Sequence, residues 1–262
     1  MYEELDVVAH RAAAPPLLNA ITELPRTLLE FQGLLASLPL LSRLQRGDAH
    51  PVLVLPGFLA GDDSTAVLRR FLGTMNYQAL PWQLGRNTGQ ANIMQSKLLD
   101  RFESLANQHA EKITIIGQSL GGVYARELAR MYPDSVRQVI TLGSPFGTRD
   151  SGTTLPLVRR LFEQQSGMTI EAMREFLLAL DPHVSPPVPV TAIYSKGDGV
   201  VNWRVCLEHE EDELTQNIEV CGSHCGMGFN PAIYYIVADR LAQPLQGWQK
   251  FEPKRGLKAF LK

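Results

Sequence analysis

The sequence has little cysteine, no surplus of positive charge and no long hydrophobic run, and each absence excludes a class of protein. Three cysteines in 262 residues are too few, and odd in number, for a disulfide-stapled scaffold. With 25 Lys and Arg against 27 Asp and Glu, few basic side chains are left to follow a phosphate backbone, so nucleic acid is not expected as the main partner. No apolar stretch reaches the roughly 18 residues that could cross a bilayer. We expect a globular protein with one large core.

The first residues bear on the compartment. A secretory signal begins with positive charge followed by an apolar stretch, whereas this chain begins Met-Tyr-Glu-Glu-Leu-Asp. We therefore expect a cytoplasmic protein. If a leader has been removed, Cys206 and Cys221 could pair in an oxidising compartment. The sequence does not indicate the oligomeric state.

A single apolar stripe from residue 17 to residue 38 predicts a helix, because apolar residues recur there at alternating steps of three and four. The stripe consists of Leu17, Ile21, Leu24, Leu28, Phe31, Leu35 and Leu38. We expect Pro25 and Pro39 to break the helix into pieces, and the stripe to pack on the main domain. A helix that docks on a lipid interface is an alternative, although Glu23, Glu30 and the scarcity of basic residues weigh against it. Binding of a partner protein is a third possibility.

Strand and helix patterns alternate through the rest of the chain. Short, continuous apolar runs, typical of strands buried on both faces, occur at residues 51–55, 113–116, 136–142 and 190–194, with weaker candidates at 77–80 and 218–220. Helical patterns separate them at residues 63–72, 93–110, 120–131 and 232–241. The alternation predicts the α/β class, with a mostly parallel sheet covered by helices on both faces.

One segment departs from simple alternation. Two amphipathic helical patterns, at residues 155–164 and 169–180, lie between the third and fourth strong strand candidates. Thr169 is a candidate N-cap, and Asp181-Pro182 is expected to stop the second helix. We therefore predict a small helical cap at 149–189, inserted into an α/β core of 49–148 and 190–262, with a helical extension at 1–48. The sequence contains no internal repeat and no dinucleotide-binding G-x-G-x-x-G motif.

The most informative motif is G-x-S-x-G at residues 117–121, which stands between a predicted buried strand and a predicted helix. In such a tight turn Ser119 must adopt strained backbone angles, and close packing favours glycine at positions 117 and 121. The turn lifts the hydroxyl above the sheet edge. It also places the Leu120 amide at a helix N-terminus, where negative charge is stabilised.

A serine hydroxyl is a weak nucleophile at neutral pH, so a base must take its proton and a third group must orient that base. Asp198 follows the apolar run 190–194, in a loop at the carboxyl end of a strand, where active sites in such sheets gather. His224 follows the weaker strand candidate 218–220. Ser119, Asp198 and His224 therefore form a predicted nucleophile, acid and base.

The other candidates fit less well. Asp181 precedes Pro182 as a helix stop and does not follow a strand. Cys221 and Cys225 flank His224, but a structural zinc site needs four ligands and the fourth has no supplier, so no metal is expected. None of the remaining histidines follows a late strand; they are His10, His50, His109, His183 and His209.

Two backbone amides are expected to hold the oxyanion that forms when Ser119 attacks a carbonyl group. The Leu120 amide is one. The second is expected from Phe58, in the turn after the first strand, where Gly57 permits close backbone approach. Leu59 and Phe146, together with apolar residues of the cap, are candidate substrate-binding residues and suggest a pocket for an apolar acyl group.

Four segments taken in order resemble the α/β-hydrolase superfamily, and within it the lipases and esterases. They are Leu-Pro-Gly-Phe at 55–58, Gly-Gln-Ser-Leu-Gly-Gly at 117–122, Asp-Gly-Val-Val at 198–201 and Gly-Ser-His at 222–224. Residues 141–147 also look like the lipase loop that leads into a cap. The likeness covers roughly residues 50 to 245. Many lipases carry His-Gly where this chain has Pro56-Gly57.

The resemblance implies Ser119 as nucleophile, His224 as general base, Asp198 as orienting acid, and the Phe58 and Leu120 amides as the oxyanion hole. It implies a carboxylic ester hydrolase, a lipase or esterase acting on fatty-acyl esters through an acyl-enzyme, without a cofactor. Contact with a lipid interface through the N-terminal helix or the cap goes with such a substrate. An acyltransferase using the same triad and a non-catalytic, hydrolase-like binding module are the alternatives.

Overall fold

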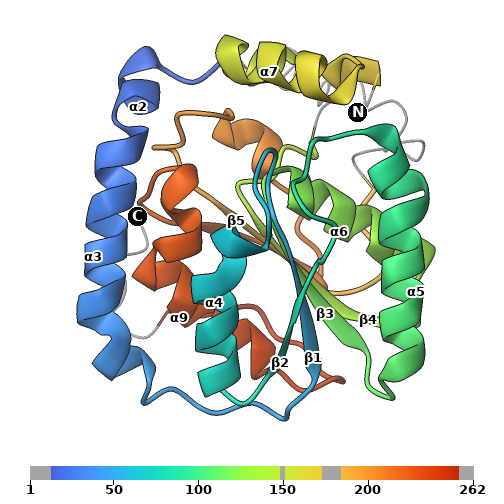
Figure 1. Ribbon diagram of the computed structural model, residues 1–262. Helices are drawn as coiled ribbons and strands as arrows, with labels where there is room; N and C mark the ends of the chain where they lie inside the picture. Colours follow the sequence, from blue (N-terminus) through green and yellow to red (C-terminus); the bar gives the residue numbers. More distant parts are fainter. Residues whose placement is uncertain (1–12, 148–150, 173–183, 254–262) are drawn as a thin grey trace.

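A six-stranded parallel sheet forms the centre of the molecule (Figure 1). The computed structural model describes residues 13–147, 151–172 and 184–253. Its strands pair in the order β2-β1-β3-β4-β5-β6, and every neighbouring pair is parallel. They are β1 (Pro51–Leu55), β2 (Gln78–Pro81), β3 (Ile113–Gln118), β4 (Val136–Leu142), β5 (Val190–Tyr194) and β6 (Thr215–Glu219). The predicted parallel α/β architecture is confirmed.

Helices cover both faces of the sheet (Figure 1). One face carries α3 (Glu23–Leu41), α4 (Asp62–Thr74) and α9 (Pro231–Leu241). The other carries α5 (Leu98–Gln108), which continues a short π-helix at Ile93–Lys97, and α6 (Leu120–Met131). Short 3-10 turns lie at Ser151–Thr153, Trp203–Cys206 (η3) and Cys225–Phe229 (η4).

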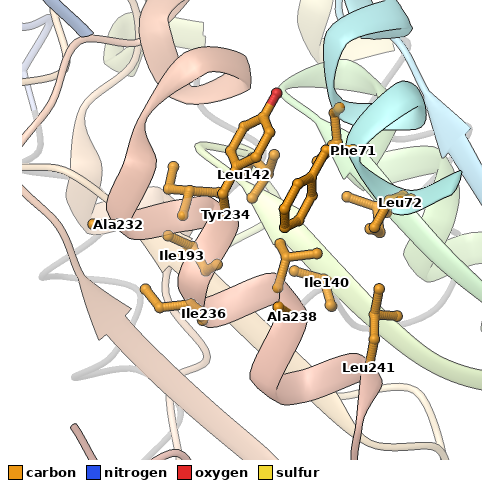
Figure 2. Close-up of a cluster of buried hydrophobic side chains, with 14 of the residues drawn as sticks. Phe71, Leu72, Ile140, Leu142, Ile193, Ala232, Tyr234, Ile236, Ala238 and Leu241 are labelled. Atoms are coloured by element: carbon orange, nitrogen blue, oxygen red, sulfur yellow. The ribbon is translucent and has the colours of Figure 1, made fainter. Parts of the chain in front are cut away.

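Each face of the sheet has its own apolar core, because successive side chains of a strand point to opposite faces. In β1, Val52 and Val54 join the core under α4 and α9, whereas Leu53 and Leu55 join the core under α5 and α6. Figure 2 shows the first of these cores, in which side chains of α4 and α9 meet those of β4 and β5. Burial on both faces explains why the central strands are rich in apolar residues.

The two weak strand predictions correspond to the two edge strands. β2 begins one residue later than the predicted 77–80, and β6 begins at Thr215, three residues before the predicted 218–220. In β6, Gln216 and Asn217 are only partly buried. Edge strands carry polar residues that weaken the apolar signal.

The N-terminal helix differs from its prediction in where it breaks. A short helix, α2 (Leu17–Ile21), ends at Thr22, and α3 then runs from Glu23 to Leu41 through both prolines. Pro25 lies in the first turn of α3, where backbone N–H groups lack helical acceptors in any case, so the missing donor costs nothing. Pro39 lies in the last turn. The prediction that the prolines break this helix is therefore wrong.

The aliphatic residues of the predicted stripe face outward, not toward the main domain, and 40% to 76% of each is exposed. Phe31, the remaining member of the stripe, is partly buried and packs against Phe229. We call this surface the outer leucine face; it consists of Leu17, Leu18, Ile21, Leu24, Leu28, Leu29, Leu35, Leu38 and Leu40. The buried residues of α3 are instead Glu23, Leu34 and Leu41. Within the described ranges, no helix combines the length and apolarity needed to span a membrane.

The predicted cap is described in part. Helix α7 (Pro156–Ser166) matches the predicted 155–164 and lies across the carboxyl ends of the strands, at the top of Figure 1. A second helical turn begins at Ile170, and Thr169 caps it, because its Oγ1 accepts the Ala172 N–H at 3.1 Å. The rest of the predicted 169–180 helix, with Asp181-Pro182, lies outside the described residues.

Candidate active site

Ser119 occupies the turn between β3 and α6. Its backbone has φ 51° and ψ −123°, a conformation that is strained for any residue with a side chain and costs about 1–3 kcal/mol. The Ser119 N–H donates to the carbonyl of Leu142, at the end of β4, at 2.8 Å. The sheet thus holds the strained turn in place, as the G-x-S-x-G motif predicts.

The glycines on either side of Ser119 are required by close packing. A Cβ on Gly117 would overlap the backbone of Gly121 and Gly122. A Cβ on Gly121 would overlap the carbonyl oxygens of Leu55 and Pro56. The helix after Ser119 can therefore approach β1 and β3 closely enough to bring its N-terminus to the sheet edge only if these positions are glycine.

His224 and Asp198 form a buried pair. The imidazole Nδ1 lies 2.6 Å from Asp198 Oδ2, and their side chains are 7% and 1% exposed. Asp198 Oδ1 accepts the N–H groups of Val200 and Val201 at 2.8 and 2.7 Å, which fixes the carboxylate in its loop. Because the carboxylate can only accept, Nδ1 carries the proton and Nε2 is left as the basic atom of a neutral ring.

The environment makes His224 a stronger base than a free histidine. Burial alone lowers its pKa, but the charge of Asp198, the hydrogen bond from Nδ1 to Asp198 and the charge of Glu23 outweigh burial, so that the pKa lies above its ordinary value. Below that pKa the ring is protonated and cannot accept a proton from a nucleophile.

A second His–Asp pair, His50 with Asp48, shows that such a pair is not diagnostic by itself. The pair lies in the segment that leads into the amino end of β1, and His50 Nε2 is 2.9 Å from Thr114 Oγ1. Burial, only partly opposed by Asp48, lowers the pKa of His50. Hydrogen bonds from His50 and Arg137 hold the pKa of Asp48 at about 2 in spite of burial. We interpret this pair as structural because no predicted site residue adjoins it.

Ser119 and His224 line the same pocket, of about 320 Å³. Within the described part of the chain no hydrogen bond joins their side chains, a looseness that is common before substrate binds. The pocket is otherwise mainly apolar and is also lined by Phe58, Leu59, Ala60, Val158, Leu161, Val200 and Phe229. A smaller chamber of about 50 Å³ adjoins Ser119 and Phe58 beneath α7 and reaches Phe162 and Ile170.

Of the two predicted substrate-binding residues, the structure brings only Leu59 to the pocket. Phe146 is 1% exposed and lines neither the pocket nor the smaller chamber. Its ring lies under the guanidinium of the buried Arg126, 3.9 Å from the ring centroid. Phe146 is therefore packed in the core beside Arg126, away from both of these cavities.

The loop that carries Phe58 is fixed by Asn87, which is fully buried. Asn87 Nδ2 donates to the Pro56 carbonyl at 2.9 Å, the Asn87 carbonyl accepts the Leu59 N–H at 2.7 Å, and the Asn87 N–H donates to Ala60 O at 2.8 Å. The Leu59 N–H is thus bonded to Asn87, and the Ala60 N–H donates to the Gly57 carbonyl within the loop at 3.2 Å. On the other side of the pocket, Leu120 is the first residue of α6, and helix geometry gives its N–H no helical acceptor.

Two cysteines, Cys221 and Cys225, lie close to His224 in the sequence. Among the described residues, no group of three or more His, Cys, Asp or Glu side chains could hold a metal ion. Burial and the Glu23 carboxylate raise the pKa of the Cys225 thiol to about 12. The thiol therefore stays protonated at neutral pH and is a poor metal ligand.

No family model and no curated protein matches the sequence. Solved structures, in contrast, share the fold of this chain. A monoacylglycerol lipase from Paleococcus ferrophilus gives a TM-score of 0.55 at 13% identity, over 76% of this chain and 96% of that one. An alpha/beta superfamily hydrolase from Oenococcus oeni gives 0.55 at 15% identity, over 75% and 94%. Aspergillus fumigatus lipase B gives 0.57 at 18% identity, over 77% and 54%. The chain has the α/β-hydrolase fold.

Within this α/β-hydrolase fold, several residues that position the site were not predicted from the sequence. Gln118 Nε2 donates to the His224 carbonyl at 3.2 Å, which ties the loop of His224 to the end of β3. Ser195 Oγ donates to Gly222 O at 2.6 Å and accepts the N–H groups of Gly197 and Gly222, which joins the loop of Asp198 to the loop of His224. A third positioning residue is Glu23, from the N-terminal helix. No local sequence pattern gave these residues a role.

Proposed function

We propose that this protein hydrolyses carboxylic esters, with Ser119 as nucleophile, His224 as general base and Asp198 as the group that orients His224. The observation that carries the proposal is the buried His224–Asp198 pair, 2.6 Å apart, whose imidazole lines the pocket that Ser119 also lines. The strained turn at Ser119 supports it. So does the fold, since solved proteins that share it include lipases.

In the first half of the reaction, Ser119 Oγ attacks the carbonyl carbon of the ester and its proton passes to His224 Nε2. The oxygen of the tetrahedral intermediate becomes negative and accepts hydrogen bonds from the Phe58 and Leu120 amides, which lowers the barrier by a few kcal/mol. Asp198 stabilises the imidazolium. The C–O bond to the alcohol then breaks, and the alcohol leaves with the proton from His224, so that Ser119 carries the acyl group.

In the second half, water attacks the acyl-enzyme while His224 Nε2 takes one of its protons. The same two amides hold the second oxyanion. When the intermediate collapses, the bond to Ser119 Oγ breaks, the proton returns to that oxygen, and the carboxylic acid leaves. Every proton is carried by His224, so the cycle needs no cofactor.

We further propose an apolar acyl group as the preferred substrate, held between the core and a cap at residues 149–189. In this division residues 49–148 and 190–262 are the core and residues 1–48 are the N-terminal extension. Support comes from α7, which contributes Val158 and Leu161 to the pocket beside Ser119. A pocket with apolar walls and few polar groups stabilises a hydrocarbon chain by removing it from water.

Nitrophenyl esters of increasing acyl length test the proposed activity and substrate together. We expect kcat/KM to rise about three- to fourfold for each added CH₂ until the pocket is filled. Leu161→Ala should alter this dependence. Leu157→Ala should not, because Leu157 lies on the same helix but is 63% exposed and does not line the pocket. Absence of turnover with every ester would refute hydrolysis. Ester products in the presence of added alcohol, in place of free acid, would indicate an acyltransferase.

The outer leucine face supports a second part of the proposal, contact with a lipid interface that presents the substrate. Residues 17–41 contain three charged side chains, Glu23, Arg26 and Glu30, and all three form hydrogen bonds toward the main domain. The outward surface is therefore uncharged and apolar. Its apolar residues are neighbours, whereas exposed apolar residues on an ordinary surface are scattered singly. Because it lacks Lys and Arg, we propose a lipid aggregate with uncharged or zwitterionic head groups as its partner.

Flotation with phosphatidylcholine vesicles tests this contact. The double substitution Leu24→Glu and Leu28→Glu should abolish flotation and reduce the rate on an emulsified ester, because it places two charges on the face that must leave water. The rate on a dissolved short-chain ester should stay unchanged. Met131→Glu, at a 52% exposed position of α6 on the opposite face of the sheet, is the control. A double variant that still floats, or a wild-type protein that dimerises through this face and ignores vesicles, would contradict the proposal.

A further inference from the structure

Glu23, the first residue of α3, is buried although it carries a charge, and is only 5% exposed. Its carboxylate accepts three backbone N–H groups. Oε1 accepts those of Gly199 and His224 at 2.8 and 3.0 Å, and Oε2 accepts that of Cys225 at 2.9 Å. Arg26 Nη2 donates to Oε1 at 3.1 Å. Burial of a carboxylate is costly unless hydrogen bonds satisfy it. The three N–H groups and Arg26 provide those bonds, so the position of the Glu23 carboxylate is fixed by its partners.

The three amides belong to the two loops that carry the proposed acid and base. Gly199 directly follows Asp198, and the other two amides are those of His224 and the residue after it. One carboxylate therefore links the loop after β5 to the loop after β6 at the point where the Asp198–His224 hydrogen bond forms. If the two loops moved apart, both the contacts of Glu23 and the 2.6 Å contact between Nδ1 and Oδ2 would lengthen.

We propose that Glu23 is a positioning residue, which holds the Asp198 and His224 loops together through the amides of Gly199, His224 and Cys225 and so makes α3 part of the active site. This inference rests on the proposed function, since it concerns the same two side chains. It changes the status of the N-terminal helix, which on sequence alone is an extension outside the hydrolase-like region.

The neighbours of Glu23 on α3 make parallel contacts to the same loops. Arg26 Nη1 donates to the carbonyls of Gly197 and Gly222 at 2.7 and 3.2 Å, and so bridges the same pair of loops. Glu30 Oε1 accepts the Ser223 N–H at 2.6 Å, and Oε2 accepts the Ser223 hydroxyl at 3.0 Å. Glu23 differs from both because its carboxylate accepts the backbone N–H of His224 itself, together with those of the residues that directly follow Asp198 and His224.

The charge of Glu23 gives the proposal a signature that a purely structural contact lacks. The charges that act on the His224 ring are those of Asp198, from the loop after β5, and Glu23, from α3; Arg26, Glu30 and the Cys225 thiol lie around Glu23. Glu23 is among the groups that raise the pKa of His224 against the effect of burial. Removing its charge should therefore lower that pKa. Because the base works when neutral, the rising limb of kcat/KM should move to lower pH.

Three variants of the full chain test the inference by pH profiles of ester hydrolysis. In the wild type the midpoint of the rising limb should lie above about 6.5. Glu23→Gln should lower kcat by about ten- to a hundredfold, because small displacements of reacting groups have effects of that size, with KM nearly unchanged and the midpoint shifted down. Glu23→Asp keeps the charge but shortens the side chain, so kcat should fall while the midpoint stays near the wild-type value. Glu30→Gln, on the same helix and bonded to Ser223, is the matched control and should leave the midpoint unchanged.

A folded Glu23→Gln variant with wild-type kcat and midpoint would overturn the inference, as would equal shifts in Glu23→Gln and Glu30→Gln. An NMR titration of the His224 ring in the wild type and in all three variants reads the pKa without turnover. If the wild type hydrolyses no ester but the ring still titrates lower in Glu23→Gln alone, the proposed function fails and the inference about Glu23 stands. If the wild type is active and the ring titrates identically in all variants, the proposed function stands and the inference about Glu23 fails.

Discussion

Replacing Ser119 with alanine should reduce ester hydrolysis by at least about 10⁴-fold in kcat, because a serine hydrolase without its nucleophile retains only the contribution of its oxyanion donors and of substrate binding. The protein should fold as before. The substitution removes one oxygen that makes no hydrogen bond to His224 and leaves the backbone contact of Ser119 with Leu142 intact. Initial rates with a nitrophenyl ester, measured on protein of verified melting temperature, check the prediction.

Ser64→Ala is the matched control. Ser64 lines the same pocket as Ser119, but its hydroxyl donates to the Gly61 carbonyl at 2.7 Å and lies at the start of a different helix, α4. Loss of a hydroxyl from the pocket should by itself leave the rate near the wild-type value. A Ser119→Ala protein that retains a large part of the activity would mean that another group attacks the ester.

Replacing Asp198 with asparagine should lower kcat by about 10⁴-fold while the fold is kept. The asparagine oxygen can still accept the N–H groups of Val200 and Val201, and its NH₂ group then faces Nδ1 of His224. Because that group donates, Nδ1 must become the acceptor and the ring proton moves to Nε2. The nitrogen that should take the proton of Ser119 is then already protonated. Steady-state rates and the NMR signals of the ring tautomer test this directly.

The second His–Asp pair supplies a control of similar geometry. Asp48→Asn changes the partner of His50 Nδ1 in the same chemical way, but at the opposite end of the sheet, where the hydroxyl beside Nε2 is that of the fully buried Thr114. It should reduce stability, since Asp48 also binds Arg137 at 2.8 Å, and leave kcat unaffected. Equal loss of activity in both variants would show that the Asp198 effect is one of folding.

The sequence allowed the central sheet, the turn at Ser119 and the three proposed reacting residues to be predicted, because their signals are local. Strands buried on both faces are mostly apolar, and the packing of α6 against β1 and β3 requires glycine at 117 and 121. The order of Asp198 and His224 after late strands follows from the same pattern. Edge strands, which carry polar residues, were placed only approximately.

The N-terminal helix could not be predicted correctly because its burial depends on partners far away in the chain. Residues 17–41 carry two stripes, one of leucines and one that includes Glu23, Glu30, Leu34 and Leu41. A hydrophobic pattern favours burial of the leucines. The opposite occurs, since the amides that satisfy Glu23 and Glu30 lie more than 170 residues later. The sequence does show that all charges of this helix lie on one side, and this pattern could have indicated that the charged side is the buried one. Glu23 and Glu30 therefore do not oppose lipid contact, although the sequence analysis counted them against it.

The core position of Phe146 was missed for a related reason. Its position after β4, in a loop that resembles the entry to a lipase cap, favoured the pocket. A buried arginine, Arg126, paired with Glu208, instead covers the ring. A buried ion pair between segments about 80 residues apart leaves no trace in the local pattern.

Covalent labelling with a fluorophosphonate, followed by mass spectrometry of the digested protein, tests most directly whether His224 and Asp198 make one hydroxyl reactive. We predict a single adduct on the peptide that contains Ser119, formed faster as pH rises through the pKa of His224 and absent in Ser119→Ala. An adduct on a different residue, or an unlabelled protein that nevertheless hydrolyses esters, would contradict the account.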